Sequence, residues 1–173
     1  IGGNFMWITL LVLGGLLILD QLTKYLSEIL IARGSEVTLI PHVLDVTLTY
    51  NTGAAWSFLS DHTWILAVVS FIASAVLVYF ITKNNWKKKK CYSIAITLML
   101  AGTFGNFIDR FFSCIGLRDG VIDMIIFKPL DTVWNWITKS GFPIFNVADM
   151  CLVIGIVFLA VDIIFFQEKR AKS

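Results

Sequence analysis

Four long apolar segments constrain this chain more than any other feature of its sequence. They cover residues 5–26, 64–81, 92–112 and 148–166, and each is about as long as a helix needs to cross a hydrocarbon core of roughly 30 Å. Hydrophobic residues make up 57% of the chain and charged residues 15%, unlike the balance of soluble domains. We therefore predict an all-α membrane protein, a bundle of four transmembrane helices in a single domain over residues 1–173.

Basic residues gather in two places, and their distribution predicts the orientation of the chain. One group lies between the second and third apolar segments and the other follows the fourth: Lys83, Lys87, Lys88, Lys89 and Lys90, then Lys169, Arg170 and Lys172. Because basic connections favour the cytoplasm, we expect both termini there and the connections 31–61 and 113–147 on the outer face. The basic runs are interpreted as topology determinants with some affinity for anionic lipid, and no nucleic-acid partner is expected.

The first apolar segment is predicted to be a retained helix. Its apolar run is too long for a cleaved signal peptide, and it has neither a basic n-region nor a small-residue cleavage site. Met6 is a candidate native start, which leaves the origin of residues 1–5 open.

The first outer connection carries a strand pattern. Residues 36–40 and 43–50 alternate apolar with polar side chains on either side of Pro41 and His42, as strands with one apolar face do. Open strand edges cannot lie within hydrocarbon, so we expect a small ribbon at the bilayer surface. Residues 51–56 (NTGAAW) follow; their small side chains permit close approach of a substrate or a neighbouring helix, and a plain packing turn is an equal alternative.

Polar side chains from separate segments are expected at one depth near the outer face. Asp20 lies late in the first span, and Lys24 follows one turn later on the same face, so the two form a structural ion pair or support a site. The third span ends at this face, and the fourth begins there. The residues gathered at this depth are Asp20, Asn51, Asn106, Asp109, Arg110, Asn146 and Asp149, with Asp123 from the second outer connection.

Acids and amides dominate this cluster, which indicates aspartate chemistry. The two histidines lack the spacing of metal ligands, so neither a metal nor another cofactor is expected, and no Ser or Cys has an evident base. Two neighbouring aspartates share a proton, so one can activate water while the other polarises a peptide carbonyl. Spacing does not decide which acids pair. A proton-coupled transporter and a noncatalytic scaffold that binds lipid or signal peptides are the alternatives.

Five short blocks occur in a fixed order along the chain. They are residues 20–24 (DQLTK), 51–55 (NTGAA), 105–110 (GNFIDR), 120–123 (GVID) and 145–149 (FNVAD). Together with the four spans, they resemble the lipoprotein signal peptidases, also called signal peptidase II, over nearly the whole chain. The resemblance implies an aspartic endopeptidase of the bacterial inner membrane, with its active site at the outer leaflet. Such an enzyme removes the signal peptide of a diacylglyceryl-modified prolipoprotein just before the lipidated cysteine.

The resemblance also assigns roles to residues and to loops. It implies a catalytic pair of Asp123 and Asp149, a small extracytoplasmic β-sheet cradle and a short interfacial helix or flap. Asp109 then becomes a supporting acid held by basic neighbours. The other matched residues are expected to bind substrate or support the site: Asp20, Lys24, Asn51, Gly53, Gly102, Gly105, Asn106, Arg110 and Asn146. We expect a monomer whose partners are the prolipoprotein and membrane lipids.

Some residues depart from the family pattern. Met124, Met150 and Trp56 replace the Phe, Ser and Phe that are common in the family, and residues 111–119 and 127–143 form longer loops. The second loop contains Trp134, Trp136 and Lys139, a composition suited to a flap on the membrane that shapes access to the dyad. A tolerated surface insertion is an equal alternative.

Overall fold

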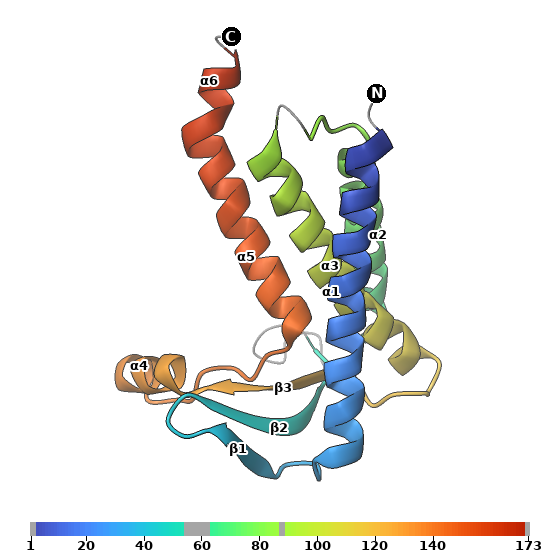
Figure 1. Ribbon diagram of the computed structural model, residues 1–173. Coiled ribbons are helices and arrows are strands. Elements are labelled where there is room, and N and C mark those ends of the chain that lie inside the picture. The colour runs from blue at the N-terminus through green and yellow to red at the C-terminus, as the bar shows by residue number, and fades with distance from the viewer. Residues whose placement is uncertain (1–2, 54–62, 87–88, 172–173) are drawn as a thin grey trace.

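The computed structural model describes residues 3–53, 63–86 and 89–171. The chain forms, in order, α1 (Gly3–Leu30), β1 (Glu36–Ile40), β2 (Leu44–Asn51), α2 (Thr63–Thr82), α3 (Lys90–Cys114), β3 (Val121–Phe127), α4 (Lys128–Thr138), α5 (Val147–Val161), the π-helical turn η2 (Asp162–Gln167) and α6 (Glu168–Ala171), as Figure 1 shows. Residues 54–56 of the NTGAAW block, and Lys87, Lys88 and Lys172 of the basic runs, lie outside the described residues.

Among the residues that the structure describes, four helices are long and apolar enough to cross a membrane. They are Trp7–Leu30, Thr63–Thr82, Lys90–Cys114 and Val147–Arg170, the last formed by α5, η2 and α6 together. The predicted four-helix bundle is therefore confirmed. Each helix extends beyond the apolar segment that predicted it, because backbone hydrogen bonding continues past the hydrocarbon-facing residues.

The central helix of the bundle is α3, which packs against α1, α2 and α5. Leu77 and Ile81 of α2 and Ile96 and Leu100 of α3 form one buried apolar cluster. The outer helices leave many large apolar side chains exposed, among them Leu11, Ile18 and Val153. In a membrane such surfaces face lipid, so the exposed fractions fit helices that use hydrocarbon as their solvent.

A small antiparallel sheet lies across one end of the bundle. Its strand order is β1-β2-β3, and β2 pairs with β3 so that Thr49 stands opposite Asp123. The two strands predicted from alternation are confirmed as β1 and β2. The third strand was not predicted as a strand from its pattern, because VIDMIIF is a nearly continuous apolar run without period-two alternation. Val121, Ile122, Asp123 and Met124 are all buried.

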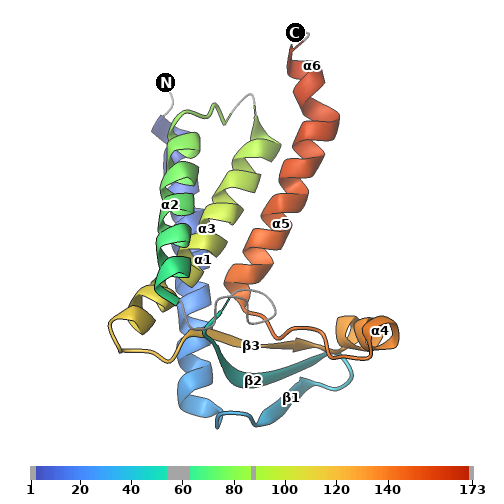
Figure 2. The ribbon, with the colours of Figure 1, turned by 180° about the vertical axis from the view of Figure 1, so that it is seen from behind.

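The two ends of the bundle differ. Both chain termini, the end of α2 and the start of α3 lie at one end, and the sheet and α4 lie at the other (Figures 1 and 2). This arrangement agrees with the predicted sharing of one membrane face by the termini and the basic connection. Which face is cytoplasmic stays a prediction from the distribution of Lys and Arg.

Candidate functional site

Asp123 lies on the strand that faces the end of the bundle. Its position on β3 follows the buried Val121 and Ile122, and its side chain is 6% exposed. The hydroxyl of Thr49 on β2 donates to the Asp123 main-chain oxygen over 3.0 Å. The sheet therefore holds the backbone of Asp123 in place while its carboxyl group points at neighbours from other elements.

Asp149 lies in the first turn of α5, where Asn146 is the residue that caps the helix. The backbone N–H of Asp149 donates to Asn146 Oδ1 over 2.9 Å, and the Asn146 N–H donates to Asp149 Oδ2 over 3.1 Å. This reciprocal capping box satisfies two N–H groups that the helix itself cannot. The predicted position of Asp149 in the first turn is confirmed, and the same bonds orient its carboxylate.

Three asparagines join the two acids into one hydrogen-bonded group. Asn51 Nδ2 and Asn146 Nδ2 donate to the two oxygens of Asp123, over 3.1 Å and 2.7 Å. Asn106 Nδ2 donates to Asp149 Oδ1 over 2.8 Å, and Asn146 Nδ2 also donates to Asn106 Oδ1 over 3.1 Å. Residues from β2, β3, α3 and α5 therefore meet at one place, as the shared-depth argument predicted.

Burial changes the acidity of Asp123. Loss of solvent around the carboxylate, together with the negative charge of nearby Asp149, raises the pKa of Asp123 to about 7, although the amides of Asn51 and Asn146 and the charge of Lys24 act to lower it. A carboxyl group with such a pKa keeps its proton in a useful fraction of molecules near neutral pH. The pair thus offers an acid and a base in contact with the same amides.

A cluster of buried charges lies beneath the two acids. Lys24 is fully buried, and its ammonium group lies 2.8 Å from Asp20 Oδ2, 2.6 Å from Asp109 Oδ2 and 3.2 Å from Asn106 Oδ1. The ammonium group thus donates hydrogen bonds to Asp20 and Asn106 and forms an ion pair with Asp109. The i,i+4 pair of Asp20 and Lys24 is present as predicted, and through Asn106 it is also connected to Asp149, so both interpretations of that pair describe the geometry.

Two further members of this charge cluster were not predicted as site residues. Arg118 Nη1 forms an ion pair with Asp109, and its Nη2 lies 3.4 Å from Glu28. Gln21 Nε2 donates to both Asp20 and Asp109, over 3.1 Å and 3.2 Å. Gln21 stood next to a residue singled out in the sequence, but Arg118 lies in the irregular connection after α3, where no periodicity indicates what a side chain contacts.

Asp20 also caps α5 from a different helix. Its Oδ1 accepts the N–H of Ala148 over 2.9 Å, one residue before Asp149. Because the N-terminus of a helix carries partial positive charge, a carboxylate there is stabilising. The charge cluster on α1 and α3 is thereby tied to the turn that carries Asp149.

Gly102 and Gly105 allow α3 and α5 to approach closely. A Cβ on Gly102 would collide with the Ala148 carbonyl oxygen and lie 2.8 Å from Leu152 N, and one on Gly105 would lie 2.8 Å from Asp20 Oδ2. Only hydrogen fits at these positions, so both residues set the spacing that lets Asn106 reach Asp149.

We expect Gly102→Ala to lower cleavage about 10- to 100-fold, because the added methyl group pushes away the first turn of α5, and a shift of about 1 Å at a catalytic group has effects of this size. Initial rates and thermal unfolding of the purified variant measure the change. The matched control is Gly14→Ala, where nothing lies within 4 Å of the added Cβ. An active Gly102→Ala enzyme would contradict the close-packing argument.

Arg110 and Gly53 lie at the edge of this group. Arg110 Nη1 donates to Ser70 Oγ of α2 over 3.0 Å, and its buried Nε has no hydrogen-bond partner among the described residues. The structure does not place Arg110 in hydrogen-bond contact with either acid, whereas Asn51, Asn106 and Asn146 contact them directly. The Gly53 N–H donates to Asn51 Oδ1 over 3.0 Å, which orients the amide that contacts Asp123.

The structure describes the surroundings of two of the three residues that depart from the family pattern. Met124 is buried with Leu48 and Ile122 in a small core on the sheet, and Met150 is 43% exposed. Trp56 lies outside the described residues. Within the described ranges, no group of three or more His, Cys, Asp or Glu side chains is arranged to hold a metal ion.

Comparison with known proteins gives one consistent result. The profile of the family described as signal peptidase (SPase) II matches residues 12–165. The lipoprotein signal peptidase of Lactiplantibacillus plantarum is 38% identical over 92% of this chain and 95% of its own, and that of Enterococcus faecalis is 40% identical over 90% and 86%. A solved structure, described as a bacterial membrane enzyme at 2.3 Å resolution, superposes with a TM-score of 0.74 at 32% identity and covers 95% of this chain and 94% of that one.

Four apolar helices, the small sheet at one end and this structural likeness define a bacterial membrane enzyme. The chain belongs to the signal peptidase II family. Members of this family are peptidases and therefore hydrolases, and the four apolar helices fit a location in a bacterial inner membrane.

Proposed function

We propose that this chain is an aspartic endopeptidase that cleaves diacylglyceryl-modified prolipoproteins just before the lipidated cysteine, with Asp123 and Asp149 as its catalytic pair. One observation carries the proposal. The buried Asp123 and the partly buried Asp149, from different elements, are joined through Asn51, Asn106 and Asn146 into one hydrogen-bonded group at the sheet end of the bundle. The names of the relatives, all lipoprotein signal peptidases, support the choice of substrate.

The reaction follows from the different states of the two acids. Asp123 holds the shared proton and donates a hydrogen bond to the oxygen of the scissile carbonyl, because its pKa is raised to about 7. Ionised Asp149 takes a proton from a water molecule, whose oxygen attacks the carbonyl carbon. When the tetrahedral intermediate collapses, the C–N bond breaks and the leaving nitrogen receives a proton from the pair.

The surrounding residues position these groups. Asn51, Asn106 and Asn146 orient the carboxyls, while Asp20, Lys24 and Asp109 fix the start of α5 relative to α3. Arg110, whose Nε has no hydrogen-bond partner among the described residues, is available to bind the substrate backbone. We place the site at the outer leaflet, with both termini cytoplasmic, and we propose that the enzyme acts as a monomer among membrane lipids.

The direct test uses the purified protein and a diacylglyceryl-modified prolipoprotein, with release of the signal peptide followed by mass spectrometry. We expect a single cut before the modified cysteine and the same rate in the presence of a chelator. No cleavage of the modified substrate, with the protein folded, would favour the noncatalytic scaffold. Cleavage that a chelator stops would overturn the metal-free mechanism.

The rate should fall as the pH rises through about 7. Asp123 must be protonated to polarise the carbonyl, and its pKa is raised to about 7 by burial and by Asp149. Asn51 lowers that pKa, so Asn51→Ala should move the alkaline limb of the kcat/KM profile upward by roughly half a unit to one unit, the equivalent of one hydrogen bond. An unchanged limb in Asn51→Ala, with Asn135→Ala as the exposed-amide control, would contradict the assignment of the proton to Asp123.

A further inference from the structure

The helix α4 has an apolar side that no described part of the protein covers. All of α4 is described, and none of its residues is buried. Trp136 is 78% exposed, Ile137 64% and Val133 57%. At 100° per residue, the apolar residues share one side of the helix and the polar residues the other. The apolar side carries Leu130, Val133, Trp136 and Ile137, and the polar side carries Lys128, Asp131, Thr132, Asn135 and Thr138.

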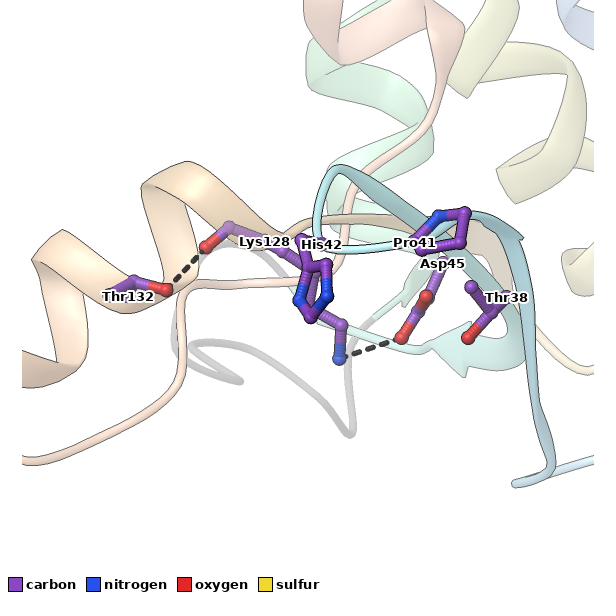
Figure 3. Close-up of a pocket in the computed structure, with 6 residues that line it drawn as sticks. All are labelled: Thr38, Pro41, His42, Asp45, Lys128 and Thr132. Carbon is purple, nitrogen blue, oxygen red and sulfur yellow. Dashed lines mark hydrogen bonds and ion pairs between the residues drawn. The ribbon is translucent and has the colours of Figure 1, made fainter.

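The polar side of α4 is turned away from the transmembrane helices. In Figure 3 the transmembrane helices enter from the top, and Lys128 points downward to Asp45, with its Nζ 2.7 Å from Asp45 Oδ2. Thr132, on the same side, lines an open pocket with His42. The hydrogen bond from Lys128 lowers the pKa of Asp45, so both groups are charged at neutral pH, as the aqueous side of an interface requires.

The apolar side of α4 is consequently turned toward the membrane. Leu130, Val133 and Ile137 are each about half a turn away from Lys128 around the helix axis. Figures 1 and 2 show α4 at the outer end of the sheet, to one side of the transmembrane bundle. On α5 the apolar side chains of Val153 and Val157 are 61% and 56% exposed, and for a membrane-spanning helix such side chains face lipid. The apolar side of α4 therefore points toward the same end of the molecule as the lipid-facing transmembrane helices.

We propose that α4 lies in the headgroup region of the leaflet next to the catalytic pair, with Leu130, Val133 and Ile137 in contact with acyl chains. An amphipathic helix with large apolar residues on one side binds to a bilayer surface in this way, and tryptophan is enriched at that level. Trp136, the most exposed large apolar side chain of α4, would lie at the boundary.

Contacts between α4 and the segment that leads to α5 connect the depth of α4 in the membrane to the position of the site. Asp131 Oδ1 accepts the N–H of Phe142 over 2.8 Å, and the Trp134 ring lies edge-on to the Phe142 ring, with centroids 5.5 Å apart. Phe142 in turn packs on Phe145, with centroids 6.0 Å apart. Phe145 forms a bridge with Ile125 of β3 and directly precedes the capping residue of α5. The height of α4 in the leaflet thereby sets the height of both acids, a consequence for cleavage that rests on the proposed function.

Nitroxide labels report which side of α4 meets lipid, independently of any cleavage. A Cys91→Ala, Cys114→Ser protein, which keeps the buried Cys151, is labelled at Ile137→Cys, Val133→Cys or, as the matched control, Asn135→Cys in phosphatidylglycerol–phosphatidylethanolamine nanodiscs. We expect the labels at 137 and 133 to be relaxed more by oxygen than by a water-soluble nickel chelate, and the label at 135 to show the reverse. Equal nickel accessibility at all three positions, or shielding of 137 from both reagents by a protein chain, would overturn the proposal.

A charge on each side of α4 tests the link to the site. In vesicles of the same lipids, Ile137→Asp should lower kcat/KM for the lipid-modified prolipoprotein on the order of tenfold, because a carboxylate is costly at that depth. Asn135→Asp, which adds the same charge on the polar side, should stay within about twofold. Equal rates for the two variants would overturn the depth role. A wild-type protein without activity would instead contradict the proposed function and leave the labelling result intact.

Discussion

Asp123→Asn and Asp149→Asn are each expected to reduce cleavage of the lipid-modified prolipoprotein by about 10³-fold or more. Attack by water requires one carboxyl group that donates a proton and another that accepts one, and either change removes one of these two roles. Removing one member of such a catalytic pair costs about as much activity as removing both. An asparagine at either position keeps only one of the two acceptor oxygens, and its NH2 group faces an N–H donor, so the thermal unfolding of each variant is measured beside its activity. Single-turnover cleavage of a labelled prolipoprotein measures the loss.

The control for this experiment is Asp119→Asn. Asp119 is an acid of the same outer connection, but its side chain is 67% exposed and forms a surface salt bridge with Arg33, which is 65% exposed. Its removal should leave the rate within about twofold. If either dyad variant kept near-normal activity while its thermal unfolding was unchanged, the acids would have to be reassigned, with Asp109 and Asp20 as the next pair to test.

The second large effect is expected on stability. Lys24→Met removes a fully buried cation and leaves Asp20 and Asp109 next to each other with 2% and 0% exposure. Breaking a buried ion pair by removing one partner costs about 3–5 kcal/mol, because the remaining charge has no solvent. For a chain of this size this corresponds to a fall of about 10 °C in the Tm. Thermal unfolding in detergent, followed by circular dichroism, measures it.

Two further variants separate charge from packing at Lys24. Arg33→Met removes a cation from an exposed pair and should cost at most about 1 kcal/mol. Adding Asp20→Asn to Lys24→Met removes the acid that has no ion pair besides Lys24 among the described residues, whereas Asp109 keeps its ion pair with Arg118. This second change should restore part of the lost Tm. If Lys24→Met alone were as stable as the native chain, the ion pairs would contribute no net stability and the charge cluster would need another explanation.

The helices could be predicted from the sequence because each signal is local. An apolar run of about twenty residues satisfies its own backbone hydrogen bonds only as a helix in lipid, and period-two alternation gave β1 and β2. The strand β3 was not predicted, because its signal is not local. The continuous apolar run of β3 fits a strand or a helix equally well, and its identity depends on pairing with β2 across more than seventy residues of sequence.

The residues of the site also separate into those that a local pattern predicted and those whose contacts depend on the fold. Depth along each helix predicted that Asp20, Asn106 and Asp149 would share a level, because rise per residue is a property of the helix itself. It did not predict that Arg118 would contact Asp109, since that contact depends on the path of an irregular connection. It also placed Arg110 with the acids, and in the structure Arg110 interacts electrostatically with Asp149, Asp109 and Asp123 while its guanidinium donates to Ser70 of α2.

By itself, therefore, the sequence determined that the chain has four helices long and apolar enough to cross a membrane, and that acids and amides collect at one end of the bundle. The tertiary structure decided which of them touch. Asp123 and Asp149 are brought together by the pairing of β3 with β2, by the close packing of α5 on Gly102, and by amides that bridge the elements. The physical reason is that composition and periodicity act along a single segment, whereas a shared proton requires two groups whose distance is set by the packing of several.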